Sequence, residues 1–197
     1  VDLYAYAPYD AATEIDSNRL LSFFVQQDQS SAGLIRKSDL LWSKMLNVST
    51  TSVSAPSLTF NHCLSKLIIN LKAGVGVTLD NTAVKVTGTK IGAKLNMING
   101  TLAEAQGDVV EITPMVHAGK FEYEAIIIPQ TVTEGTKLLR IINNGKTYYC
   151  TVKDSKEFNP GTKYAYDITI NGDDLKVEMS GTFNEWITGE TTTETIS

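Results

Sequence analysis

Two histidines, two cysteines and a pair of glutamates are the residues of this chain whose types could do chemistry. His62 stands directly before Cys63 in the segment Phe60–Leu64, which invites the hypothesis of a cysteine nucleophile activated by a histidine. Neighbouring residues of an extended strand point to opposite faces, so the two cannot hydrogen-bond within that strand. We therefore expect His62 to be packed and hydrogen-bonded rather than catalytic.

The other titratable candidates lie in segments that predict solvated positions. Glu122 and Glu124 share one strand face, whereas glycoside hydrolysis needs two carboxylates that face each other at about 5–9 Å. His117 precedes Ala118-Gly119, a predicted hairpin tip, where a solvated turn residue is the default. Asp173-Asp174 also lies in a predicted turn and lacks the alternating ligand spacing of a calcium loop. We expect no catalytic, cofactor-binding or metal residue, and hence a protein that is not an enzyme and has no cofactor.

Net charge, cysteine spacing and the first residues of the chain limit which partners, metal sites and processing we expect. The 197 residues include 17 basic and 22 acidic side chains, and the net charge of −5 argues against nucleic acid, which needs a basic face. Cys63 and Cys150 match no zinc spacing, and their sequence leaves open a disulfide or two free, half-buried thiols. The chain opens at Val1-Asp2 without a basic and then apolar run, so we expect a processed form or a fragment.

The elements that must position these residues are mainly strands. Threonine occurs 23 times, and a threonine-rich chain favours half-exposed strands. Turn signals fall at Asn143-Asn144-Gly145, Asn159-Pro160-Gly161 and Asn171–Asp174. Many short strands at close spacing predict a β-sandwich. The expected strands are 58–71, 83–86, 95–98, 109–113, 121–128, 137–142, 146–153, 164–170 and 175–182.

Hydrophobic patterning assigns faces to two of these strands. In Tyr164–Ile170 the apolar side chains alternate with Ala, Asp and Thr, which predicts an antiparallel strand with one buried and one solvated face. Ala125–Ile128 is apolar on both faces and predicts a central strand. Tyr4, Tyr6 and Tyr9 form the best tyrosine cluster, which could stack on glycans or form a buried strand face.

The pattern changes before residue 50. Short aromatic pieces at Tyr4–Tyr9 and Ser22–Gln26 are separated by polar stretches. The segment Ser38–Met45 predicts a short helical turn, because Ser38 is a natural N-cap and three apolar residues follow at helical spacing. Asn47–Pro56 is rich in Ser and Thr and ends in Pro, which indicates a linker or a long loop.

Several segments resemble, in order and spacing, the fimbrillin family of Bacteroides-type bacteria, which comprises FimA-like and minor-fimbrium-like type V pilins. Phe60–Leu67 resembles the family's Phe-x-His-x-Leu-Ser-Lys-Leu strand, and Ile127–Thr131 its Ile-Pro-Gln-Thr segment. Phe158–Ile168 resembles its Gly-x-x-Tyr-x-Tyr-x-Ile hairpin. The remaining similar segments are Tyr4–Tyr9, Gln27–Ser30, Ser38–Trp42 and the late Trp186.

The resemblance implies an all-β fold of transthyretin-like antiparallel β-sandwiches in two domains. Residues 1–55 would be the C-terminal part of an N-terminal sandwich that is incomplete at its N-terminus, and residues 56–197 the C-terminal sandwich. The implied protein is a structural or adhesive subunit of type V fimbriae (a pilus) on the outer surface of the bacterium.

The resemblance also implies partners. Other fimbrial subunits, whether copies of itself or tip and anchor pilins, would bind it, as would a host glycan or protein receptor. A lipid anchor on the precursor would attach it to the outer membrane. The alternative is a surface glycan-binding lipoprotein of the same fold.

The implied assembly mechanism is strand exchange. A sandwich that lacks one strand exposes unpaired backbone groups, which a strand from the next subunit can fill. Head-to-tail contacts of this kind build an open filament. The polar tail, residues 188–197, is the candidate donor strand. Because this tail has few apolar side chains that could anchor it in a groove, the alternative is a loose chain terminus. The candidate donor positions are Thr188, Thr191, Thr193 and Ile196.

Overall fold

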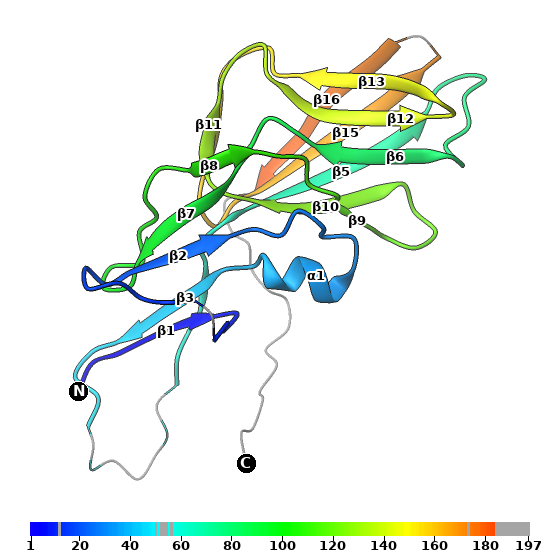
Figure 1. Ribbon diagram of the computed structural model, residues 1–197. Helices are drawn as coiled ribbons and strands as arrows, with labels where there is room; N and C mark the ends of the chain where they lie inside the picture. The colour runs from blue at the N-terminus through cyan, green and yellow to red at the C-terminus, as the bar shows by residue number, and fades with distance from the viewer. Residues whose placement is uncertain (12, 50, 52–54, 56, 173, 184–197) are drawn as a thin grey trace.

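Strands make up nearly all the regular structure in the computed structural model, which confirms the all-β class (Figure 1). The structure describes residues 1–183 except 12, 50, 52–54, 56 and 173. The helix α1 spans Ala32–Lys37. The strands are β1 (Leu3–Ala7), β2 (Leu20–Phe24), β3 (Leu41–Met45), β4 (Asn61–His62), β5 (Ser65–Ala73), β6 (Thr82–Val86), β7 (Lys90–Asn96), β8 (Gln106–Val109), β9 (Met115–Val116), β10 (Glu122–Ile127), β11 (Gln130–Val132), β12 (Lys137–Asn143), β13 (Lys146–Thr151), β14 (Lys156–Phe158), β15 (Lys163–Asn171) and β16 (Asp174–Phe183).

Two sheets form the larger part of the sandwich. A five-stranded sheet has the order β16-β15-β5-β10-β9, in which β15 and β5 run parallel and the other pairs antiparallel. A three-stranded sheet, β13-β12-β6, packs against it (Figure 1). Tyr148 bridges the two sheets, because its hydroxyl donates to the carbonyl of Gly172 in the turn between β15 and β16.

The N-terminal strands join sheets with strands from later in the chain. β2 pairs with β7 in the sheet β2-β7-β8, and β3 pairs with β1 and β4 in the sheet β1-β3-β4. β11 and β14 form a two-stranded sheet. Hydrogen-bonded pairing therefore links residues on both sides of position 55, where we expect a domain boundary; that boundary stays a prediction.

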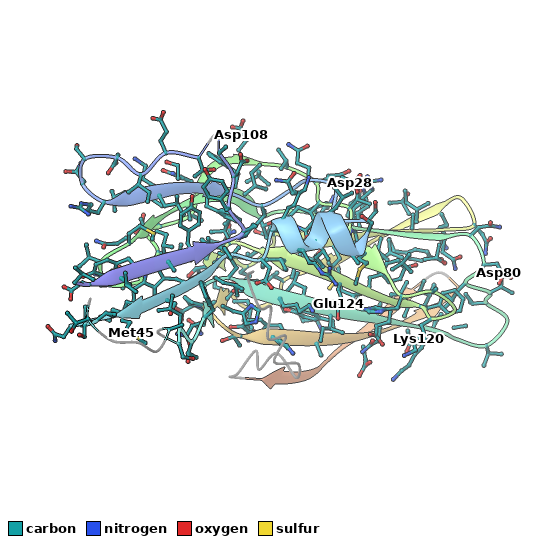
Figure 2. All side chains as sticks on the ribbon, turned by 90° about the horizontal axis from the view of Figure 1, so that it is seen from below. Asp28, Met45, Asp80, Asp108, Lys120 and Glu124 are labelled. Carbon is teal, nitrogen blue, oxygen red and sulfur yellow. The ribbon has the colours of Figure 1, made fainter. Side chains whose placement is uncertain are left out.

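One hydrophobic core runs through these sheets. It extends from Leu21 on β2 to Ile170 on β15 and includes the face of β15 that the alternation predicts. Ala125 to Ile128 are all buried, as the apolar run predicts for a central strand. The molecule is elongated, with Met45 near one end, Lys120 and Asp80 near the other, and Glu124 between them (Figure 2).

The prediction of a helical turn over Ser38–Met45 is wrong. The helix lies earlier, where the Ser31 hydroxyl caps it by accepting from the Leu34 N–H, and Ser38 is its C-cap. The Ser38 hydroxyl is buried and accepts from the Gln26 N–H instead. Residues 41–45 form β3 because β1 offers a hydrogen-bonding partner, and this tertiary contact overrides a weak local preference.

The turns are predicted better than the strand limits. Asn144 and Gly145 both have positive φ in the hairpin between β12 and β13, and Gly161 and Gly172 do so in the other two predicted turns. The limits of two expected strands are wrong, since β7 is 90–96 rather than 95–98 and β8 is 106–109 rather than 109–113. The expected strand 58–71 divides into β4 and β5.

Candidate functional site: open sheet edges and a polar cluster

Two strand edges without a described strand partner border one groove. β1 is the edge of its sheet and pairs only with β3, and β2 is the edge of its sheet and pairs only with β7 among the described strands. The loop before β2 covers the start of its outer edge, where Ile15 bridges Leu21 and the Asp16 N–H donates to the Leu20 carbonyl. The groove has a volume of about 510 Å³. Its lining includes Tyr6 from β1, Ser22 and Phe24 from β2, and Tyr9 from the loop after β1. We call it the β1–β2 groove.

Aromatic side chains give the β1–β2 groove an apolar, accessible wall. Tyr9 is 78% exposed and Phe24 is 52% exposed. Tyr4 and Tyr6 are partly buried against the core, so the three tyrosines do not form a common exposed platform of the kind that stacks on glycans. The groove thus combines the edge of β1 and a partly open edge of β2 with aromatic surface, the two features that an added strand uses for affinity and register.

A second groove lies at the free edge of β13. Its volume is about 810 Å³, and its lining includes Leu138, Cys150, Val152 and Tyr166. At the start of β13, Lys146 and Tyr148 both donate to the carbonyl of Gly172, which ties this end of the strand to the five-stranded sheet. The groove therefore lies beside the later residues of β13.

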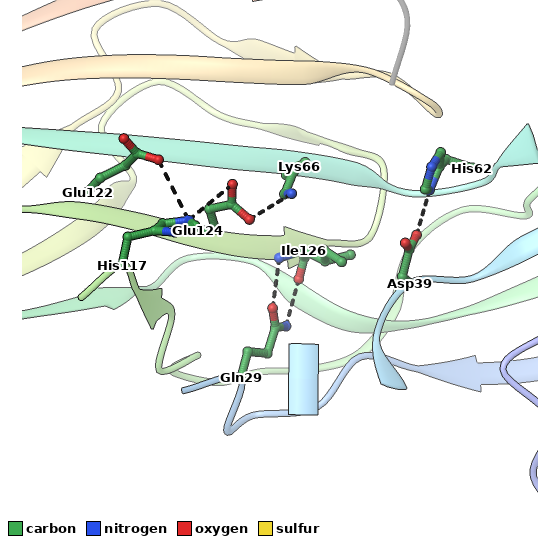
Figure 3. A network of polar contacts seen from close by, with 8 residues as sticks. All are labelled: Gln29, Asp39, His62, Lys66, His117, Glu122, Glu124 and Ile126. Atoms are coloured by element: carbon green, nitrogen blue, oxygen red, sulfur yellow. Dashed lines mark hydrogen bonds and ion pairs between the residues drawn. The ribbon is translucent and has the colours of Figure 1, made fainter. Parts of the chain in front are cut away.

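A polar cluster occupies the outer face of the five-stranded sheet (Figure 3). Lys66 on β5 pairs with Glu124 on β10 at 2.7 Å between Nζ and Oε2, and both side chains are largely covered. His117 follows β9 and places Nε2 3.6 Å from Oε1 of Glu122 and 3.4 Å from Oε1 of Glu124. The two glutamates share a face as predicted, but Glu124 and His117 are not the freely solvated residues that we expect.

His62 is packed and paired, as the sequence predicts. Its Nδ1 lies 2.7 Å from Oδ1 of Asp39, and only 5% of the side chain is exposed. Burial raises the pKa of the neighbouring Cys63 thiol to about 12, whereas nucleophilic cysteines have a lowered pKa. Cys63 and Cys150 are both free thiols in the structure, not a disulfide. Both are buried, whereas we expect half-buried thiols.

A glutamine side chain closes an edge that the sheet leaves open. β9 pairs with β10 only at Tyr123 and Glu124, so Ile126 lies beyond its reach. There Gln29 takes the place of a strand: its Oε1 accepts from the Ile126 N–H and its Nε2 donates to the Ile126 carbonyl, each at 2.8 Å (Figure 3). The segment before α1 is thereby fixed to the core strand β10.

The predicted donor positions Thr188, Thr191, Thr193 and Ile196 lie outside the described residues, as does Trp186. Sequence reasoning did not find the β1–β2 groove, Lys66 or the role of Gln29, because each depends on which strands become neighbours. Within the described part of the chain, no helix is long and apolar enough to cross a membrane.

Solved structures of other proteins show a similar fold. A candidate cell adhesion protein from Bacteroides ovatus is similar with a TM-score of 0.75 and 21% identity, over 96% of this chain and 69% of that one. Another from Bacteroides uniformis has a TM-score of 0.71 and 24% identity, over 93% and 72% of the two chains. The tip fimbrial protein Mfa3 from Porphyromonas gingivalis has a TM-score of 0.54 and 11% identity, over 75% and 64%.

The fold is therefore that of a β-sandwich class that includes proteins of bacterial fimbriae. The comparison with curated proteins found no match. The sequence matches the fimbrillin-like family over residues 1–186, and the chain belongs to that family.

Proposed function

We propose that this chain is a structural or adhesive subunit of fimbriae on the bacterial cell surface, that it has no catalytic role, and that it joins its neighbours by strand exchange. Membership of the fimbrillin-like family supports the fimbrial role and the surface location. The observation that carries the assembly mechanism is the edge of β1 together with the part of the β2 edge beyond its bridge to Ile15, on either side of one groove.

A strand in the β1–β2 groove would satisfy backbone groups that no described strand pairs. An unpaired edge attracts any extended segment, and natural proteins normally cover such edges. Backbone hydrogen bonds along β1 or β2 would give affinity, while contacts with Tyr9 and Phe24 would set which side chains of the added strand point inward. In this proposal residues 1–55 supply the open edges, and residues 56–197 supply the sandwich that holds them.

The tail that contains Thr188, Thr191, Thr193 and Ile196 is the proposed donor to the next subunit. A groove at one place and a donor at another make a head-to-tail contact, which does not close on itself and so yields a filament. Tip and anchor pilins would then bind through the same groove or the same tail. Attachment of the precursor to the outer membrane by a lipid, and a host glycan or protein receptor, belong to this proposal as well.

Disulfide trapping in the bacterium tests the groove and the donor together. Ser22 lines the groove and is exposed, so Ser22→Cys combined with Thr191→Cys should produce a ladder of covalent oligomers after mild oxidation of intact cells. Background from the native cysteines should be low because both are buried. The same design applies to Thr188, Thr193 and Ile196.

Lys120→Cys combined with Thr191→Cys is the matched control, since Lys120 is exposed in the turn between β9 and β10, outside the groove. We expect a ladder with the groove variant and none with the control. If none of the four tail positions crosslinks to Ser22→Cys while filaments still form, the proposed donor and acceptor pairing is wrong.

A further inference from the structure

His117, Glu122 and Glu124 converge through the register of two strands. His117 directly follows β9, and its N–H bonds the carbonyl of Glu122 on β10, so the two residues stand opposite each other. Glu124 is two residues further along the same face of β10. One imidazole nitrogen and one oxygen from each carboxylate all lie within 4.8 Å of one another.

The spacing of His117 Nε2 from the two carboxylate oxygens matches metal coordination better than hydrogen bonding. Nε2 of His117 is buried, and it makes no hydrogen bond in the described part of the chain. Its distances to the two carboxylate oxygens, 3.4 and 3.6 Å, exceed those of an ordinary N–H···O bond. A tetrahedral zinc ion with bonds of about 2.0–2.1 Å holds its ligand atoms about 3.3–3.4 Å apart.

A neighbouring side chain already orients one of the carboxylates. Lys66 binds Oε2 of Glu124 at 2.7 Å, which leaves Oε1 on the side of His117. Both partners of this ion pair are about 15% exposed, so the carboxylate has little freedom to rotate away. Partners of this kind fix the orientation of metal ligands in known sites.

We propose that His117, Glu122 and Glu124 bind a divalent transition-metal ion of the zinc type, with water completing the coordination. An imidazole nitrogen with two carboxylate oxygens suits zinc, whereas calcium and magnesium prefer oxygen ligands alone. The two carboxylates balance the charge of the ion, although Lys66 and nearby Lys163 reduce the affinity. The bound ion would fasten the two-residue edge strand β9 and its turn to β10.

Titration of the full chain without a histidine tag tests the site. Isothermal titration with zinc chloride should give one ion per chain, and His117→Ala and Glu124→Gln should each weaken binding at least tenfold. Glu157→Gln is the matched control, because Glu157 is exposed on β14 and far from the cluster in sequence. Affinity should also fall as the pH is lowered, because a histidine must be neutral to ligate a metal.

Two further readouts distinguish a built site from other binding. With zinc at about a hundred times its dissociation constant, the folded-to-unfolded ratio should rise about 100-fold in the wild type and in Glu157→Gln, but not in His117→Ala. Cobalt(II) should give tetrahedral visible bands without a thiolate charge-transfer band. Absence of binding, binding that survives His117→Ala, or a thiolate band from the cysteines would each overturn the proposal.

Discussion

The side chain of Gln29 offers the sharpest test of how the N-terminal segment is held. Gln29 is fully buried, and its side chain makes three hydrogen bonds, two with the backbone of Ile126 and one from Nε2 to the carbonyl of Gln26 at 3.1 Å. Ile126 is itself 2% exposed, so water cannot replace the lost partner. Gln29→Leu keeps a side chain of similar size and removes all three bonds.

The expected cost follows from the groups that lose their partners. Each buried backbone group left without a hydrogen bond costs about 1–3 kcal/mol, which gives about 2–6 kcal/mol for the N–H and carbonyl of Ile126. Burial of the leucine side chain offsets about 1 kcal/mol. We therefore expect the free energy of unfolding to fall by about 3 kcal/mol, which corresponds to a decrease in Tm of about 6–12 °C for a domain of this size.

Equilibrium denaturation in urea, together with calorimetry, measures this loss. The control is Gln27→Leu, because Gln27 is exposed and the same change there should stay within about 0.5 kcal/mol. A loss below about 1 kcal/mol for Gln29→Leu, or equal losses for both variants, would refute the view that this carboxamide replaces a strand at the edge of β10.

Three other predictions concern the cysteines, one ion pair and one glycine. The two thiols, with pKa values that burial raises to about 12 and about 11, should resist alkylation at pH 8 in the native protein and react after unfolding; rapid native labelling would contradict their burial. The Arg140 guanidinium bonds Glu111 at 2.8 Å and lowers the pKa of that carboxyl below its ordinary 4.5. The contribution of this ion pair to stability is therefore complete above about pH 4.5 and is lost as the pH falls below that value. Glu111→Gln should flatten the dependence of Tm on pH in that range, and an unchanged slope would contradict this prediction. Gly100 has φ of +75° and faces the ring of Trp42, so Gly100→Ala should lower the free energy of unfolding, measured in urea, by about 2–4 kcal/mol. Gly145 also has positive φ, but a Cβ there meets no neighbour, so Gly145→Ala should cost only about 1 kcal/mol. Equal losses would show that the Trp42 ring can move aside.

Strands with strong local signals are predictable from the sequence. β12 and β13 follow from two apolar runs around Asn144-Gly145, two residues that tolerate positive φ. The start of β7 is not predictable in this way, because Gly92 and Ala93 have low strand preference. Gly92 fits this strand because the ring of Phe24 from β2 lies against it, so that a Cβ there would be 2.6 Å from the ring.

The candidate sites depend on information that the local sequence does not carry. The shared face of Glu122 and Glu124 follows from the period of a strand, and the sequence predicts it. Lys66 and His117 lie next to Glu124 because of the register of β10 with β5 and β9. A one-residue slip in that register would move these side chains to the opposite face of the sheet. The β1–β2 groove likewise exists only because β1 and β2 belong to different sheets.

Electron microscopy of surface-sheared material, labelled with an antibody to this chain, tests the fimbrial role most directly. We predict that the label lies on filaments, along the shaft or at one end, and that a strain lacking the gene loses this label. If filaments remain unlabelled and the label is confined to the cell envelope, the chain is not a fimbrial subunit.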